Sequence, residues 1–252
     1  MLSGTIISHN WRVSTQNGNA GTWTDVVNGG VYSGAKTATL TITAPPLSMN
    51  GYVYKDSIRT AGCRDSSSRF AVLTVNPLPT ISISASPYLK LFPGLTTTLS
   101  STVSPLARVG GYSWLRNGSA VAGANTGTLL VGIDQLGDYR LMVTDTNGCV
   151  NTSSMTVSIT DSLSSKVFIY PNPNRGMFQV RYYSVINNAG LPRGVNVYDS
   201  RGTRILTQAY SINSPYARMD IDLSNQGTGV YWIEVVDANG NRLAMGRVDV
   251  IR

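Results

Sequence analysis

Short runs of alternating apolar and polar residues recur along the whole chain, separated by clusters of Gly, Asn, Pro and Ser. The runs are rich in Val, Ile, Thr and Tyr, and clear examples are residues 39–43, 70–75, 81–85, 155–159 and 230–235. They follow one another roughly every 8–12 residues, which is typical of all-β sandwiches. Helical periodicity is almost absent. The pattern therefore predicts an all-β fold of antiparallel sheets, each with one buried and one wet face.

Two breaks in this pattern predict the domain boundaries. Pro77 and Pro79 follow an apolar strand and cannot continue it, because proline lacks the N–H that a strand donates. The second break, residues 161–165, is a run of small and polar residues. We therefore predict units at residues 1–76, 77–160 and 166–252, with 161–165 as a linker.

The first two units share an arrangement of aromatic residues. Each has a Trp on a central strand (Trp11, Trp114), a later Tyr after a Gly-containing corner (Tyr52, Tyr139) and then a Gly-Cys pair. This arrangement matches the core tryptophan and tyrosine corner of immunoglobulin-like sandwiches, in which both residues have packing roles. We expect tandem immunoglobulin-like β-sandwiches, followed by a smaller antiparallel β-sandwich at the C-terminus.

The first unit also resembles the immunoglobulin-like repeats of large surface proteins of Gram-negative bacteria. The resemblance is carried by residues 11–15, 21–24, 34–41 and 49–52. Trp11 stands so near the start that the first two strands of a sandwich have no room before it. The chain also opens without a signal peptide. These features favour a chain that begins inside a longer protein; the alternative is a unit that accepts strands from a neighbour by strand exchange.

Composition excludes several classes of function. Of 252 residues, 42% are hydrophobic and only 13% are charged, and the net charge of +7 is spread without a basic run, so we expect no nucleic-acid partner. Cys63 and Cys149 fall at matching places in successive units, so a disulfide between them is not expected. No apolar run reaches the roughly 18 residues of a membrane-spanning helix.

Catalytic chemistry is hard to assemble from these residues. His9 is the single histidine and Glu234 the single glutamate, and no motif of a hydrolase, metalloprotease or phosphate-binding loop occurs. Residues 145–148 read as a hairpin turn rather than a calcium loop, because the ligand series stops there. We expect no enzyme activity and no catalytic, cofactor-binding or metal-binding residues.

Residues 166–252 carry the strongest signal, a series of short motifs in a fixed order. In local terms, two prolines keep the entering chain extended, and Asp/Asn-containing turns end in glycine where a positive φ is needed. The motif residues are Pro171, Asn172, Pro173, Gly176, Tyr198, Asp199, Gly202, Asp222, Leu223, Gly229, Tyr231, Arg247 and Arg252. Their order resembles the type-A C-terminal sorting domain of the type IX secretion system.

This resemblance implies a secreted protein at the cell surface of a Gram-negative bacterium. It implies that an outer-membrane secretion translocon recognises the domain. The resemblance further implies that a sortase, as is usual in the family, removes the domain near residues 161–166 and joins the cargo to a lipopolysaccharide anchor. Arg247 and Arg252 depart from the pattern, because they stand where family members often have Lys.

Three functions remain open from the sequence. The leading hypothesis is an adhesin-like or stalk-like surface protein. The second is a structural subunit of an extracellular fibre or surface array, self-associating by β-strand addition. The third is the spacer and sorting tail of a larger secreted enzyme. Loops at residues 17–34 and 108–111 are candidates for ligand contact by exposure alone.

Overall fold

Strands make up nearly all of the regular structure, as the alternating pattern predicts. The computed structural model describes residues 6–16, 23–61, 69–186 and 190–251, and within them the only helical elements are three short 3₁₀ turns. None of these turns is long or apolar enough to cross a membrane. The expected all-β class is confirmed.

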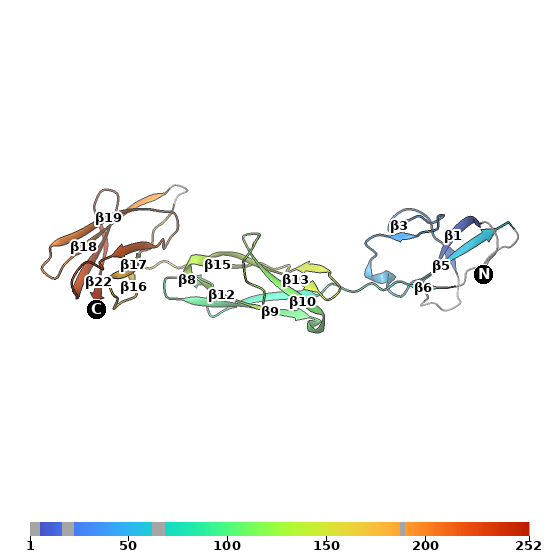
Figure 1. Ribbon diagram of the computed structural model, residues 1–252, viewed down its shortest axis with the longest axis horizontal. Coiled ribbons are helices and arrows are strands. Elements are labelled where there is room, and N and C mark those ends of the chain that lie inside the picture. Colours follow the sequence, from blue (N-terminus) through green and yellow to red (C-terminus); the bar gives the residue numbers. More distant parts are fainter. Residues whose placement is uncertain (1–5, 17–22, 62–68, 187–189, 252) are drawn as a thin grey trace. The chain divides into compact units, whose positions relative to one another are not determined.

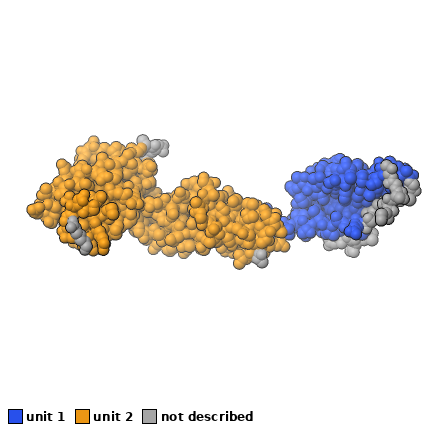
Figure 2. Space-filling view, viewed as in Figure 1, with its two compact units in different colours: residues 1–78 blue, residues 79–252 orange. Residues whose placement is uncertain are grey.

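The chain forms two compact units, residues 1–78 and 79–252 (Figure 2). The second unit contains two sandwiches, one carrying β7–β15 and the other β16–β22 (Figure 1). These two sandwiches share no strand among the described residues.

The first unit is built on one antiparallel sheet in the order β2-β1-β5-β6, beside the small β3–β4 pair. Its elements are β1 (Ile6–Ser14), β2 (Thr24–Asp25), β3 (Tyr32–Ser33), β4 (Thr41–Ile42), η1 (Leu47–Met49), β5 (Val53–Thr60) and β6 (Ala71–Val72). Its buried apolar core is small: Val13, Val26, Ala35, Met49 and Tyr54.

The next sandwich packs the sheet β12-β9-β7 against a larger sheet in the order β11-β10-β13-β15-β8, with β14 beside β13. Its strands are β7 (Thr80–Ser86), β8 (Lys90–Leu91), β9 (Thr96–Ser104), β10 (Val109–Arg116), β11 (Ser119–Ala120), β12 (Thr128–Gly132), β13 (Gly137–Asp145), β14 (Val150–Thr152) and β15 (Val157–Asp161). Two 3₁₀ turns, η2 (Leu106–Arg108) and η3 (Ile133–Gln135), join them. Its core draws apolar side chains from both sheets around Trp114.

The predicted core tryptophans occupy corresponding positions in the first two sandwiches. The indole Nε1–H of Trp11 donates to the carbonyl of Thr37 over 3.0 Å, and that of Trp114 donates to the carbonyl of Thr126 over 2.9 Å. Trp114 is fully buried between its two sheets, whereas Trp11 is only half-buried. The two tryptophans thus make equivalent hydrogen bonds, but they differ in how far they are buried.

The buried tyrosine of the first unit lies two residues later in the sequence than predicted. Tyr139 lies opposite Arg116 and is buried, and its hydroxyl donates to the carbonyl of Gln135. In the first unit the equivalent position, opposite Val13, is held by Tyr54. Tyr54 is buried and Tyr52 is only half-buried, so the register favours Tyr54 for the role expected of Tyr52.

The cysteines give no disulfide among the described residues. Cys149 is a free, half-buried thiol. Cys63 lies outside the described residues.

The last sandwich packs the sheet β16-β17-β20 against the sheet β19-β18-β21-β22. Its strands are β16 (Phe168–Tyr170), β17 (Met177–Arg181), β18 (Leu191–Tyr198), β19 (Arg204–Ile212), β20 (Met219–Asp222), β21 (Gly229–Val236) and β22 (Arg242–Val250). Apolar residues alternate inward along β17, β18 and β21 and form the largest buried cluster of the chain. This sandwich carries all the predicted motif residues that the structure describes.

Candidate functional site

The Pro-Asn-Pro motif attaches the start of the last sandwich to its final strand. The Asn172 side chain donates from Nδ2 to the carbonyl of Arg247 over 3.1 Å, and its Oδ1 accepts the N–H of Asp249 over 2.9 Å. An asparagine side chain can make both bonds because its amide mimics a peptide group. Pro171 and Pro173 flank it, with cis peptide bonds before both. The Asn172 side chain therefore makes two hydrogen bonds to the backbone of β22, as a neighbouring strand would.

Asn174 extends this attachment into the protein interior, although the motif analysis did not single it out. It is buried, and its backbone exchanges bonds with Asp249 and Ile251 at 3.0 and 2.8 Å. Its side chain donates to the carbonyl of Pro171 and accepts the N–H of Gly176. The buried backbone and side-chain amides of Asn174 are thus hydrogen-bonded within the protein in place of water.

Gly176 lies against the motif segment that contains Asp222 and Leu223. Its φ is +101°, and its carbonyl accepts the N–H of Leu223 over 2.7 Å. A Cβ placed there would stand 2.7 Å from the backbone N and Cα of Ser224. Asp222 fixes that same segment, since its carboxylate accepts the N–H of Ser224. Gly176, Asp222 and the buried Leu223 thus meet in space, although the sequence separates them.

Asp199, Gly202 and Tyr231 of the motif form or fix turns. Asp199 accepts N–H bonds across the β18–β19 turn, which closes at Gly202 with φ +81°. These bonds lower the pKa of the Asp199 carboxyl, the Thr203 N–H contributing most. Tyr231, two residues after Gly229, is buried and donates its hydroxyl to the carbonyl of Gly227 over 2.6 Å.

Three motif residues lie nearer the surface or beyond the described part. The Tyr198 hydroxyl donates to Glu234, and this bond raises the pKa of Tyr198. Arg247 is largely exposed and pairs with Asp249 at 3.1 Å. Arg252 lies outside the described residues. Most of the motif therefore builds the sandwich, and little of it is free side chain.

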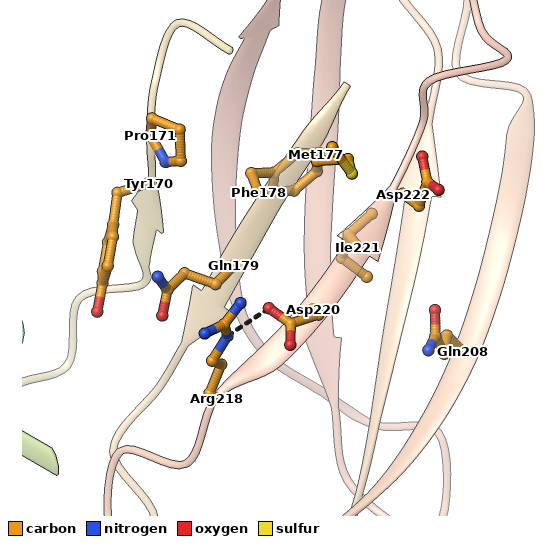
Figure 3. A pocket seen from close by; sticks show the side chains of 10 residues that line it. All are labelled: Tyr170, Pro171, Met177, Phe178, Gln179, Gln208, Arg218, Asp220, Ile221 and Asp222. Atoms are coloured by element: carbon orange, nitrogen blue, oxygen red, sulfur yellow. Dashed lines mark hydrogen bonds and ion pairs between the residues drawn. The ribbon is translucent and has the colours of Figure 1, made fainter. Parts of the chain in front are cut away.

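A groove opens where two motif segments reach the surface (Figure 3). It has a volume of about 410 Å³ and lies on the sheet β16-β17-β20, next to β19. Its lining is Tyr170, Pro171, Met177, Phe178, Gln179, Gln208, Arg218, Asp220, Ile221 and Asp222. Arg218 and Asp220, two residues apart on the same segment of chain, pair at 2.5 Å on one side of the groove, and Met177 is exposed. The groove thus combines apolar surface with one ion pair, a mixture common in contacts with polypeptides.

The single histidine and the single glutamate lie in different sandwiches, each bonded to a neighbouring strand. Within the part of the chain that the structure describes, no three His, Cys, Asp or Glu side chains come close enough to hold a metal ion. His9 on β1 pairs with Asp56 on β5, Nδ1 to Oδ2, at 2.6 Å, and so joins two neighbouring strands. Glu234 accepts bonds from Asn196 and Tyr198 on the adjacent strand.

Comparison with known proteins identifies the last sandwich. Residues 168–244 match the family described as the secretion system C-terminal sorting domain. No curated protein matches the chain.

Several solved structures of serial β modules are similar at low identity. The N-terminal eight Ig domains of Down Syndrome Cell Adhesion Molecule match at 15% identity and TM-score 0.30, covering 96% of this chain and 31% of that one. Dimeric latent PorU from Porphyromonas gingivalis matches at 13% identity and TM-score 0.30, covering 98% and 30%. The fibronectin(III)-like modules of Clostridium thermocellum CbhA match at 14% and 0.28, covering 68% and 93%. This chain thus spans about a third of the length of the first two, and likenesses this weak carry no functional argument.

The family assignment agrees with the motif order on which the sequence prediction rested. A sorting domain of this family directs its carrier to the secretion machinery, so the protein is secreted and targeted to the surface of a Gram-negative cell. Residues 168–244 are a type IX secretion system C-terminal sorting domain, carried behind immunoglobulin-like β-sandwiches.

Proposed function

We propose that this chain is an exported adhesin-like or stalk-like protein, whose immunoglobulin-like sandwiches act outside the cell while the last sandwich serves as the export signal. The observation that carries the proposal is the sorting domain at residues 168–244. The sandwiches ahead of it are modules of the kind that present loops or space out other domains, and we assign them no catalytic role.

The proposal assigns separate partners to separate parts. The translocon binds the sorting domain, and the groove beside Pro171 and Asp222 is the surface we assign to that contact. A sortase acts at the segment before the domain, where Leu163 is 74% exposed and Ser165 and Lys166 are also exposed. The released cargo is then held by a lipopolysaccharide anchor.

Export can be tested in a bacterium that has a type IX system. An epitope-tagged full chain fused behind a signal peptide is expected on the cell surface or in the medium, whereas the same fusion stopping before Lys166 should stay in the periplasm. The mass of the exported form should show loss of the residues after about 161–166. Equal surface labelling of the two chains would overturn the proposal.

A second candidate, a fibre or array subunit assembled by β-strand addition, is favoured by the first unit. Trp11 is half-buried where Trp114 is fully buried, and Ile6 and Ile7 on β1 are 50% and 60% exposed. Among the described residues β1 pairs with β2 only at Arg12 and Val13, so its start lies beside a strand on the β5 side alone, and such a segment is a template for an added strand. Light scattering on the purified full chain tests this. Concentration-dependent assemblies that Ile7→Lys abolishes would favour a fibre subunit, and a monomer at all concentrations would remove this candidate.

A further inference from the structure

The guanidinium of Arg181, on β17 of the sorting domain, is buried and has its carboxylate partner in the preceding sandwich. Only 4% of the side chain is exposed, and Nη1 and Nη2 meet the two oxygens of Asp134 in η3 at 2.5 and 2.8 Å. The remaining donors reach the Gln179 side chain at 2.8 Å and the carbonyl of Tyr216 at 3.0 Å. Such a fork-to-fork pair fixes orientation as well as distance.

Aromatic rings continue this contact next to the ion pair. Phe92, from the preceding sandwich, stacks on Phe168 of β16 with centroids 5.5 Å apart. Phe168 in turn meets the edge of Tyr216 at 5.9 Å, and Tyr183 meets Tyr216 at 5.4 Å. We call these residues, with Asp134 and Arg181, the seam. The guanidinium is buried while 67% of the Asp134 side chain is exposed, so the contact combines stacked apolar rings with an ion pair that is desolvated on the Arg181 side only.

The segment that connects the two sandwiches is held by the same seam. The N–H of Ser162 donates to the carbonyl of Leu91 at 2.7 Å and so continues the parallel pairing of β15 with β8. The carbonyl of Ser162 accepts the hydroxyl of Tyr216 at 2.7 Å. Burial raises the pKa of Tyr216 to about 12, so this hydroxyl stays protonated and can donate. Ser162 is thus tied to both sandwiches, and little chain remains before β16 begins at Phe168.

We propose that the seam is a docking site by which the sorting domain binds its own preceding module, and that docking keeps the connecting segment closed to proteases. A protease needs the residues on both sides of the cut bond to lie extended in its cleft. The exposure of Leu163, Ser165 and Lys166 does not allow this while Ser162 and Phe168 on either side of them are held by the seam. Separation of the sorting domain from the cargo, which rests on the proposed function, then requires the seam to open first.

The test uses trypsin on the full chain and follows cleavage after Lys166. Where opening is fast compared with cleavage, the rate follows the population of the open form. Asp134→Asn removes the charge while keeping the shape, and leaves Arg181 as a buried cation without its partner. We expect cleavage after Lys166 to become at least about five-fold faster in Asp134→Asn. Phe92→Ala should act in the same direction.

Two controls separate seam opening from general unfolding. Asp138→Asn changes a carboxylate of the same sandwich that bonds only within it, to Ser158, and should cleave at the wild-type rate. Cleavage after Arg201, on an 86% exposed turn side chain of the sorting domain, should stay unchanged in every variant. Equal rates after Lys166 in Asp134→Asn and wild type would overturn the proposal. So would a wild-type chain cut as fast after Lys166 as after Arg201. Neither outcome depends on export, so failure of the secretion assay would be a separate result.

Discussion

At the scale of single residues, the sorting motif is explained mainly by backbone geometry. Gly176 is present because a side chain would collide with Ser224, and Asn172 is present because its amide completes the edge of β22. A motif that builds the fold can still identify a family, since the same backbone geometry requires the same residues wherever the fold occurs. This explains why few motif side chains project from the surface.

Gly176→Ala tests the steric part of this explanation. Its φ of +101° and the 2.7 Å approach to the Ser224 backbone should together cost more than the roughly 1–3 kcal/mol of an unfavourable backbone conformation alone. Gly202→Ala is the matched control, because its φ is +81° but no atom lies within 4 Å of the added Cβ. Urea unfolding of the full chain measures both. Equal losses of unfolding free energy would show that the close approach carries no cost.

At the scale of elements, one turn design recurs in three hairpins. Asp145, Asp199 and Asp237 each accept the N–H groups of the residues two and four positions later, at 2.8 or 2.9 Å. In each turn the glycine three positions later has φ of 81–82°. The sequence predicts a hairpin turn at residues 145–148 and Asp/Asn-containing turns that end in glycine within residues 166–252, and the strand pairs β13–β14, β18–β19 and β21–β22 confirm these turns.

These turns give the sandwiches a defined response to acid. Backbone N–H bonds lower the pKa of Asp145 and Asp199, and the Asn241 side chain and backbone lower that of Asp237. A carboxyl whose pKa is lower in the folded state stabilises the fold above its unfolded pKa of about 3.9, and this stability is lost as the pH falls through the folded value. The difference in unfolding free energy between wild type and Asp199→Asn should therefore be full at pH 7 and shrink steadily below about pH 4. Ser200→Ala, in the same turn, should keep the pH dependence of wild type, and a pH-independent Asp199→Asn difference would contradict this account.

At the scale of the whole molecule, the sequence predicted the repeated sandwiches and the sorting domain but not the seam. Alternation along β17 places Phe178 and Val180 inward, so Arg181 reads as an outward, solvated residue. It is buried because another sandwich covers it, and its partner Asp134 lies 47 residues away with no local pattern linking the two. Tyr54 was missed for a related reason, since cross-strand register sets its burial and spacing along the chain does not. Contacts between separately patterned elements leave no periodic signal.

The attachment of Asn172 and Asn174 to β22 also has a consequence for the order of events in time. Within this sandwich β22 is the strand that a ribosome makes last, and without it the Pro-Asn-Pro segment has no edge to join and the sheet β19-β18-β21 lacks its outer strand. Any product of interrupted synthesis that stops before β22 therefore lacks the folded signal, however complete its other modules are. Export through this domain would thereby discriminate against chains that were interrupted before β22.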